Sequence, residues 1–488
     1  MKEKKTIGIN ALLNMARSVM GMLFPLITFP YASRILSVSN IGKVNYASSV
    51  VSYFSLFAML GIPVYATREG ARIREDKGKT ERFVSEVFSL NILASIISMI
   101  VLFALIYATN IFDGYESLLL IYAIQIPLTV IGTDWINSIF EDYFYITVRS
   151  LLFQLIGLIL IICMVREPSD YYRYAICLVV TSYGSGILNA FYTKKYCKKK
   201  ITFNLRIIKH LKPVLVLFAT NLAALIYTSA DTTMLGLMST DYNVGIYTTA
   251  AKVYGIFKQL AFAVVIVCLP RFSYIVANKT KAEYEKLAGK LFKVVLTLAF
   301  PLAVGIYFLS GPIIQILAGE NFMPAIYPLK LLSIAIFVAI LAYFVMQLVL
   351  LPNKKDSVIL KATVISGVFN IAGNFLLIPR YLENAAAFTT VISELIVLII
   401  TWNASQKIVK LKVGRKNTIS IFIAGSIMGL TLYGINKIEM GALITLLLGF
   451  IVGSAVYLTI LVVARNDVVI EGISIIKKYL IKREKSAF

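Results

Sequence analysis

Apolar runs of about twenty residues follow one another along nearly the whole chain, and this feature restricts the fold more than any other. A helix of that length crosses a hydrocarbon layer about 30 Å thick. Only 15% of the 488 residues are charged and 59% are hydrophobic, whereas soluble domains carry about 25% charged residues. A membrane β-barrel would need much shorter segments that alternate apolar and polar residues. We therefore predict an all-α polytopic membrane protein.

The runs predict about fourteen transmembrane helices, and the loops between them predict their orientation. With the N-terminus in the cytoplasm, 37 of the 48 lysines and arginines fall in cytoplasmic segments and five fall outside. Cytoplasmic loops retain Lys and Arg, so both termini are predicted in the cytoplasm. Topology thus explains the net charge of +23 without a nucleic acid partner. The predicted spans are 9–34, 41–66, 83–108, 116–140, 147–165, 171–193, 213–237, 243–269, 291–312, 325–351, 358–379, 385–405, 418–436 and 440–464.

Two halves are predicted from the long basic connection at 194–212 and from an internal repeat. Residues 42–68 match residues 245–271 at seven positions without gaps, and repeated halves build the alternating-access cavity of many transporters. The connection suits either anionic lipid headgroups or a plain cytoplasmic loop. The expected parts are an N-lobe of six helices (1–193), the linker (194–212), a C-lobe of six helices (213–405), two extra helices (406–464) and a basic cytoplasmic tail (465–488).

Cations inside the predicted spans are the candidate substrate-binding residues. Arg17 lies about nine residues into the first span, where a charge costs about 2.5–3.5 kcal/mol and normally faces a bundle interior or a watery cavity. Asn14 shares its helical face, although close helix packing explains Asn14 equally well. Arg34 and Lys43 lie near the outer end of the first helical hairpin, where snorkelling to lipid headgroups competes with substrate contact.

The eighth predicted span carries the cations of the second half. Lys252 and Gln259 share one helical face, which we expect to line the cavity, and Lys258 lies about 120° around the helix from Lys252. Lys258 contacts substrate, snorkels to the membrane surface or pairs within the bundle. On the second span, Ser48, Ser52 and their neighbours form a small polar stripe. The stripe fits either close helix contact or a wetted wall.

Embedded carboxylates and the scarcity of catalytic motifs complete the candidate site. The embedded carboxylates are Asp134, Asp231 and Glu394. Each has two possible roles, which are to bind a coupling proton or sodium ion, or to neutralise a nearby cation. No Walker loop or catalytic triad pattern occurs, and four scattered cysteines with the single His210 predict no metal site. We expect a transporter without catalytic residues or cofactor. Coupling to a proton gradient, a sodium gradient or the membrane potential is left open.

Four stretches resemble the Wzx-type polysaccharide flippases of the multidrug/oligosaccharidyl-lipid/polysaccharide exporter superfamily. They are LFPLITFPYASRILSVSNIGKVNYASSVVSYFSLFAMLGI (23–62), YATREGARIRED (65–76), TDWINSIFEDYFYITVRS (133–150) and AAKVYGIFKQLAFAVVIVCLPRFS (250–273). The resemblance extends along essentially the whole chain. It implies two six-helix lobes around a V-shaped cavity, two additional C-terminal helices, and transfer of undecaprenyl-pyrophosphate-linked oligosaccharide to the outer leaflet of the bacterial cytoplasmic membrane.

The resemblance also implies roles for individual residues and partners. In the related lipid II flippases, arginines on the first, second and eighth helices recognise substrate, and Arg17, Arg34 and Lys252 match them in charge here. A lysine at 252 keeps the point charge but loses a bidentate grip on phosphate. Expected partners are the lipid-linked oligosaccharide, anionic membrane lipids and the polysaccharide polymerase with its chain-length machinery. The alternatives are a lipid II flippase, a drug/cation antiporter of the same superfamily, and a membrane-embedded polysaccharide polymerase or ligase.

Overall fold

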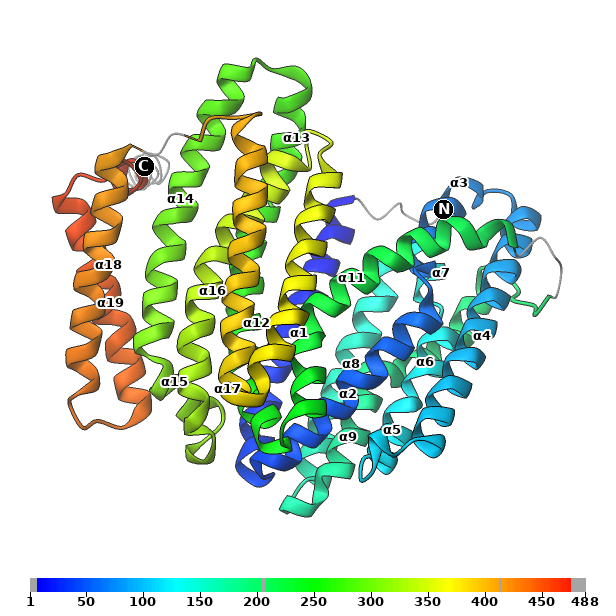
Figure 1. The fold of residues 1–488 in the computed structure, drawn as a ribbon. Coiled ribbons are helices and arrows are strands. Elements are labelled where there is room, and N and C mark those ends of the chain that lie inside the picture. The colour runs from blue at the N-terminus through cyan, green and yellow to red at the C-terminus, as the bar shows by residue number, and fades with distance from the viewer. Residues whose placement is uncertain (1–6, 203–207, 412–413, 475–488) are drawn as a thin grey trace, which may run out of the picture. The chain divides into compact units, whose positions relative to one another are not determined.

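The computed structural model describes residues 7–202, 208–411 and 414–474, except for the side chains of 7–12, 14–19 and 22. This part of the chain consists of helices joined by short turns, and it contains no β-strand (Figure 1). Twelve of its helices are long and apolar enough to cross a membrane. The predicted all-helical membrane architecture is confirmed.

The predicted count of fourteen spans and the orientation of the termini stay predictions. α17 (Asp356–Gln406) is one element of 51 residues that is interrupted at Leu382, where φ is 52° and ψ is −130°. The sequence placed the break between two spans at 379–385, so two predicted helices correspond to this element. α1 (Ile7–Ile35) is not one of the twelve membrane-spanning helices, which were identified among the described residues alone.

The chain divides into two compact units after Gly245. The predicted linker at 194–212 precedes this division, because the helix that follows the linker packs along α2 and α3 of the first unit. The helices of the first unit are α1, α2 (Val38–Met59), α3 (Ile62–Ile73), α4 (Lys77–Ala108), α5 (Glu116–Ala123), α6 (Gln125–Gly132), α7 (Asp134–Ile139), α8 (Tyr143–Met164), α9 (Tyr171–Val179), α10 (Ser185–Tyr192) and α11 (Ile208–Met238), with the short helical turns η1 (Asn110–Phe112), η2 (Pro168–Asp170), η3 (Val180–Gly184) and η4 (Thr193–Lys195).

The second unit begins within α12 (Asp241–Ile266) and has its own buried core. Its centre is α16 (Ile326–Phe344), which packs against α14 (Lys281–Phe308) and α17. α18 (Arg415–Asn436) and α19 (Ala442–Val463) form a hairpin beside α14 (Figure 1). The remaining elements are α13 (Leu269–Asn278), α15 (Ser310–Leu317), η6 (Glu320–Ala325) and η7 (Val345–Leu350).

A buried hydrogen-bonded chain holds the start of α11 against α3 and α4. Nε2 of His210 lies 2.9 Å from Oε2 of Glu86, and the hydroxyl of Tyr65 lies 2.7 Å from Nδ1 of the same ring. Because an ionised carboxylate only accepts hydrogen bonds, Nε2 donates to Glu86, and in the neutral ring Nδ1 then accepts from the hydroxyl of Tyr65. Lys209 adds a second contact to the same carboxylate at 2.8 Å. The basic connection therefore ends in a fixed anchor, with side chains from three helices satisfying one another.

Glycines let the first unit bring helices unusually close. A Cβ placed on Gly42 of α2 would lie 1.8 Å from the carbonyl oxygen of Asp241, the first residue of α12. Gly61 has a φ of +73° between α2 and α3, and its Cβ would lie 2.8 Å from Cβ of Leu217 on α11. Backbone approach of this kind is open only to glycine. The two ends of α2 are thus both packed against the segment formed by α11 and its following turn.

Replacing Gly42 by alanine should destabilise the first unit, because the new methyl group overlaps a backbone oxygen and forces a backbone shift. Overpacking of this kind costs about 1–3 kcal/mol. Thermal unfolding of the purified protein in detergent should show a lower midpoint for G42A. The matched control is G255A on α12, where no atom lies within 4 Å of the added Cβ. Equal unfolding midpoints for the two variants would contradict the close approach.

Candidate functional site

The first half of the predicted cationic site lies partly beyond what the structure describes. The side chains of Asn14 and Arg17 on α1 are outside the described residues. Arg34, at the end of α1, is exposed and donates from Nη1 to the carbonyl oxygen of Pro30 at 2.5 Å. Lys43 is half-buried, with Nζ 5.8 Å from the ring centroid of Tyr171. The proposed contacts of all four residues with substrate stay predictions.

The polar stripe on α2 contributes both to helix contact and to a hollow. Ser49 is buried and accepts a hydrogen bond from Thr233 of α11 at 3.1 Å. Ser55 accepts one from Nε2 of Gln125 on α6 at 3.0 Å. On the adjoining face, Ser52 and Ser55 line a hollow of about 420 Å³ between α2 and α11. The two interpretations of the stripe therefore both apply, on different sides of the helix.

This hollow, which we call the α2–α11 hollow, combines polar and apolar groups at helical spacing. Four residues of each helix occur at intervals of three and four, so each set lies on one helical face. The lining residues are Ser52, Ser55, Leu56 and Met59 of α2, and Asn221, Ala224, Leu225 and Thr228 of α11. Hydroxyl and amide groups next to methyl-rich surface match the mixed polarity of a sugar ring.

Asp231 is buried two residues before the contact between α11 and α2. Its exposed fraction is 7%, and Thr233, which bonds Ser49, follows on the same helix. Asp231 was predicted to bind a coupling ion or neutralise a cation, and its role stays a prediction. Its position places a carboxylate in the wall that α11 shares with α2.

In the second unit, Lys258 and Glu394 meet in a buried ion pair. Nζ of Lys258 lies 2.6 Å from Oε1 of Glu394, and the side chains are 17% and 5% exposed. The hydroxyl of Tyr254, one turn earlier on α12, donates to the same carboxylate oxygen at 2.8 Å. Nζ of Lys258 also donates to this hydroxyl at 2.9 Å. The three groups close a ring of hydrogen bonds between α12 and α17.

This pair bears on two predictions that the sequence could only make separately. Lys258 was predicted to contact substrate, to snorkel or to pair within the bundle, and Glu394 either to bind a coupling ion or to neutralise a cation. In the structure each residue neutralises the other. A substrate phosphate or a proton could therefore reach one of them only in competition with its partner.

Lys252 and Gln259 lie elsewhere on α12. Lys252 is half-buried, and Gln259 is exposed. The helical spacing of six residues separates Lys252 from Lys258 by about 120°, so the two lysines serve different surfaces. Lining of the cavity by Lys252 and Gln259 stays a prediction.

A buried ion pair joins α7 and α8 in the first unit. Arg149, which the predicted span 147–165 contains, lies inside α8 with only 3% exposure, and Nη2 is 2.6 Å from Oδ1 of Asp134. Nδ2 of Asn189 on α10 donates to the same oxygen at 3.0 Å. Asp134, which was predicted either to bind a coupling ion or to neutralise a nearby cation, pairs with a cation here, but nothing in the sequence showed that this cation is Arg149.

The Lys258–Glu394 pair should behave as a buried pair in mutational tests. K258M or E394Q alone leaves an uncompensated charge, which typically costs 3–5 kcal/mol, whereas removing both charges is often nearly neutral. We expect lower thermal unfolding midpoints for each single variant and a midpoint near that of the unmodified protein for K258M/E394Q. The control is K290M, because the pair of Lys290 and Glu471 is about half exposed and contributes at most about 1 kcal/mol. Single and double variants with equal midpoints would show that the pair is not coupled.

Long apolar helices that enclose buried ion pairs and a polar hollow define a multi-pass helical membrane protein. The chain belongs to the polysaccharide biosynthesis protein family, whose model matches residues 7–276. The predicted family resemblance is confirmed.

Individual relatives and a solved structure agree with this assignment. The chain is 23% identical over 380 residues to the capsular polysaccharide biosynthesis protein CapF of Staphylococcus aureus, covering 75% of this chain and 91% of that protein. It is 20% identical over 384 residues to a Shigella dysenteriae protein whose name describes an O-antigen transporter, covering 77% and 94%. Its fold is similar to that of the lipid II flippase MurJ in an inward closed conformation, with a TM-score of 0.74, 16% identity and coverage of 94% and 100%.

Proposed function

We propose that this protein is a flippase that moves undecaprenyl-pyrophosphate-linked oligosaccharide repeat units from the inner to the outer leaflet of the bacterial cytoplasmic membrane. The observation that carries the proposal is the α2–α11 hollow, which places hydroxyl and amide groups between two membrane-crossing helices of a polysaccharide biosynthesis family member. Polar groups between membrane-crossing helices are costly unless they form hydrogen bonds with a polar ligand or with one another. A carbohydrate crossing the membrane needs such partners.

The substrate's charge is matched by the predicted cations. A pyrophosphate brings negative charge into a medium of low dielectric, and Arg or Lys in a wetted cavity offsets part of its desolvation. Arg17 and Lys252 are the proposed phosphate ligands, with Arg34 and Lys43 at the outer end of the first hairpin. The predominance of embedded cations over carboxylates favours this substrate over the cationic substrates of a drug antiporter. A lipid II flippase is the second candidate, supported by the fold alone.

Alternating access with an ion-coupled step completes the proposal. Asp231 and Glu394 are the candidate coupling groups, because both are buried carboxylates in membrane-spanning helices. Protonation of Glu394 would break its ion pair with Lys258, and the ammonium group of Lys258 would then be available to bind an anion. Delivery of the carried repeat unit to a polysaccharide polymerase and its chain-length machinery on the outer face follows from the proposed direction of transport.

The hollow is tested by replacing its polar lining with apolar groups of similar size. S52A/N221L removes hydrogen-bond partners worth about 1 kcal/mol each, so transfer of a fluorescent lipid-linked oligosaccharide between the leaflets of proteoliposomes should slow about tenfold or more. T220L is the matched control, because Thr220 is exposed on the same helix and does not line the hollow. Unchanged transfer in a correctly inserted S52A/N221L would exclude the hollow from the sugar path.

The cationic part is tested separately with R17Q and K252Q. Loss of a charge-assisted contact to phosphate costs about 1.5–3 kcal/mol, which corresponds to at least a tenfold loss of transfer. R17K should retain more activity than R17Q, because it keeps the charge. The same assay with and without proton and sodium gradients identifies the coupling ion. If both charge-removing variants transfer substrate normally, the cationic part of the proposal is wrong while the hollow remains testable.

A further inference from the structure

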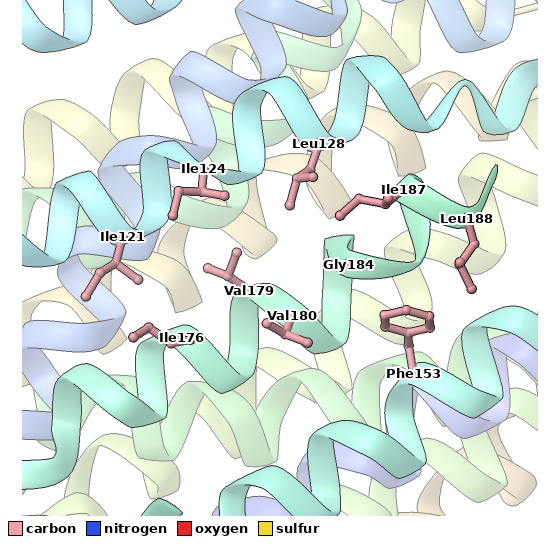
Figure 2. A pocket seen from close by; sticks show the side chains of 10 residues that line it. All are labelled: Ile121, Ile124, Leu128, Phe153, Ile176, Val179, Val180, Gly184, Ile187 and Leu188. Atoms are coloured by element: carbon pink, nitrogen blue, oxygen red, sulfur yellow. The ribbon is translucent and has the colours of Figure 1, made fainter. Parts of the chain in front are cut away.

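An apolar groove of about 430 Å³ runs along the outside of the first unit, between the helical segments α5–α6, α8 and α9–α10. All ten lining side chains are apolar or glycine, and Figure 2 shows those of α5 and α6 facing those of α9 and α10 across it. Ile124, Ile187 and Leu188 of its rim are each about half exposed. The proposed transport function does not use this groove, because it offers no group that could bind sugar or phosphate.

The groove follows from an irregularity in the α9–α10 segment, which forms one of its walls. Between α9 and α10 the backbone makes the wider π-helical turn η3, which contributes Val180 and Gly184 to the lining. A π-turn carries one more residue than an α-turn and so breaks the regular ridge of side chains along the helix. Gly184 adds no side chain at this point, and Phe153 of α8 lies beneath it. A depression remains where an ordinary helix would fill the gap between its neighbours.

The length of the groove fits one leaflet of a bilayer. Its lining extends from Ile176 to Leu188, which is about 18 Å along a helix and close to the roughly 15 Å of hydrocarbon in one leaflet. These residues lie within a membrane-spanning segment, Pro168–Lys195. An apolar groove at this depth is filled by hydrocarbon, and its direction is along the chains of a lipid.

Positive charge stands at one end of the groove. About 9 Å beyond Leu188 along the helix is the exposed Lys194, the first residue of the basic run 194–200. The next residue, Lys195, is already paired with Asp142 at 3.3 Å. Nζ of Lys194 lies 5.0 Å from the ring centroid of the exposed Phe191. Phe191 adds apolar surface between Leu188 and Lys194. Lysines near a membrane surface attract anionic headgroups. The end of the groove therefore presents a cation where a phosphate of the same leaflet would lie.

We propose that this groove is a binding site for one anionic phospholipid, with an acyl chain between α5–α6 and α9–α10 and the headgroup phosphate at Lys194. The lipid would belong to the leaflet on the side of the basic connection. It would fill the gap at η3 and so support the packing of α8 against α9 and η3. This site is separate from the proposed substrate path and does not depend on the proposed transport function.

The test measures the phospholipid that stays bound through stepwise delipidation. The protein is purified, exchanged into detergent with equal amounts of phosphatidylglycerol and phosphatidylcholine, and analysed by native mass spectrometry. We expect retention of one phosphatidylglycerol in the unmodified protein. L188W places an indole in the groove and should abolish this retention, whereas L155W should not, because Leu155 is similarly exposed, at 54% against 50%, but lies outside the lining. I124W, on the opposite wall, serves as the second blocking variant if L188W folds poorly.

The headgroup contact is tested with K194Q. Loss of one lysine near the headgroup should lower the preference for phosphatidylglycerol over phosphatidylcholine about fivefold while total lipid retention continues. K198Q in the same basic run is the control. Equal retention in L188W, I124W and L155W would overturn the site. Retention of a polyprenyl lipid in place of phospholipid, or no preference for the anionic headgroup, would overturn the assignment of the ligand.

Discussion

Compensation of charge and hydrogen-bonding capacity inside a hydrocarbon layer is the constraint on which the rest of this structure depends. Water is absent there, so a buried polar side chain needs a partner within the protein. Lys258 pairs with Glu394 and Arg149 pairs with Asp134, while His210, at the end of the basic connection, contacts Glu86 and Tyr65. The contacts of Lys258 and His210 join helices that are distant in sequence, whereas Arg149 and Asp134 lie 15 residues apart on the consecutive helices α8 and α7. The polar residues therefore determine which helices adjoin, while apolar packing supplies most of the buried surface.

Much of the fold could be predicted from the sequence because the membrane imposes one simple rule on span length. Uninterrupted apolar runs located the long helices and even the break near Leu382 in α17. The irregular turns could not be located in this way. The wide turn η7 contains mostly ordinary apolar residues such as Leu348, and the sequence of η3, VTSYG, has no motif that indicates a π-turn. Their backbone geometry is set by neighbouring helices.

The candidate site was predictable in its residue types but not in its pairings. Helical periodicity gathered Ser49, Ser52 and Ser55 on one side of α2, yet only the packed structure separates the helix contact of Ser49 from the hollow. Embedded charge identified Lys258 and Glu394 as functional candidates. The 136 residues between them offered no local signal that they form one ion pair. Pairing is a property of helix arrangement, and a single sequence contains little information on it.

The anchor at the start of α11 gives this chain an unusual experimental advantage. His210 is its only histidine, and its ring is enclosed by side chains of α3 and α4. In a protein selectively labelled with isotopic histidine, one imidazole supplies every ring signal, without overlap from others. The chemical shifts of its two nitrogens report which of them carries the proton. A single spectroscopic observable in the 488-residue chain can therefore report whether His210 keeps its contacts with Glu86 and Tyr65 when the first unit moves.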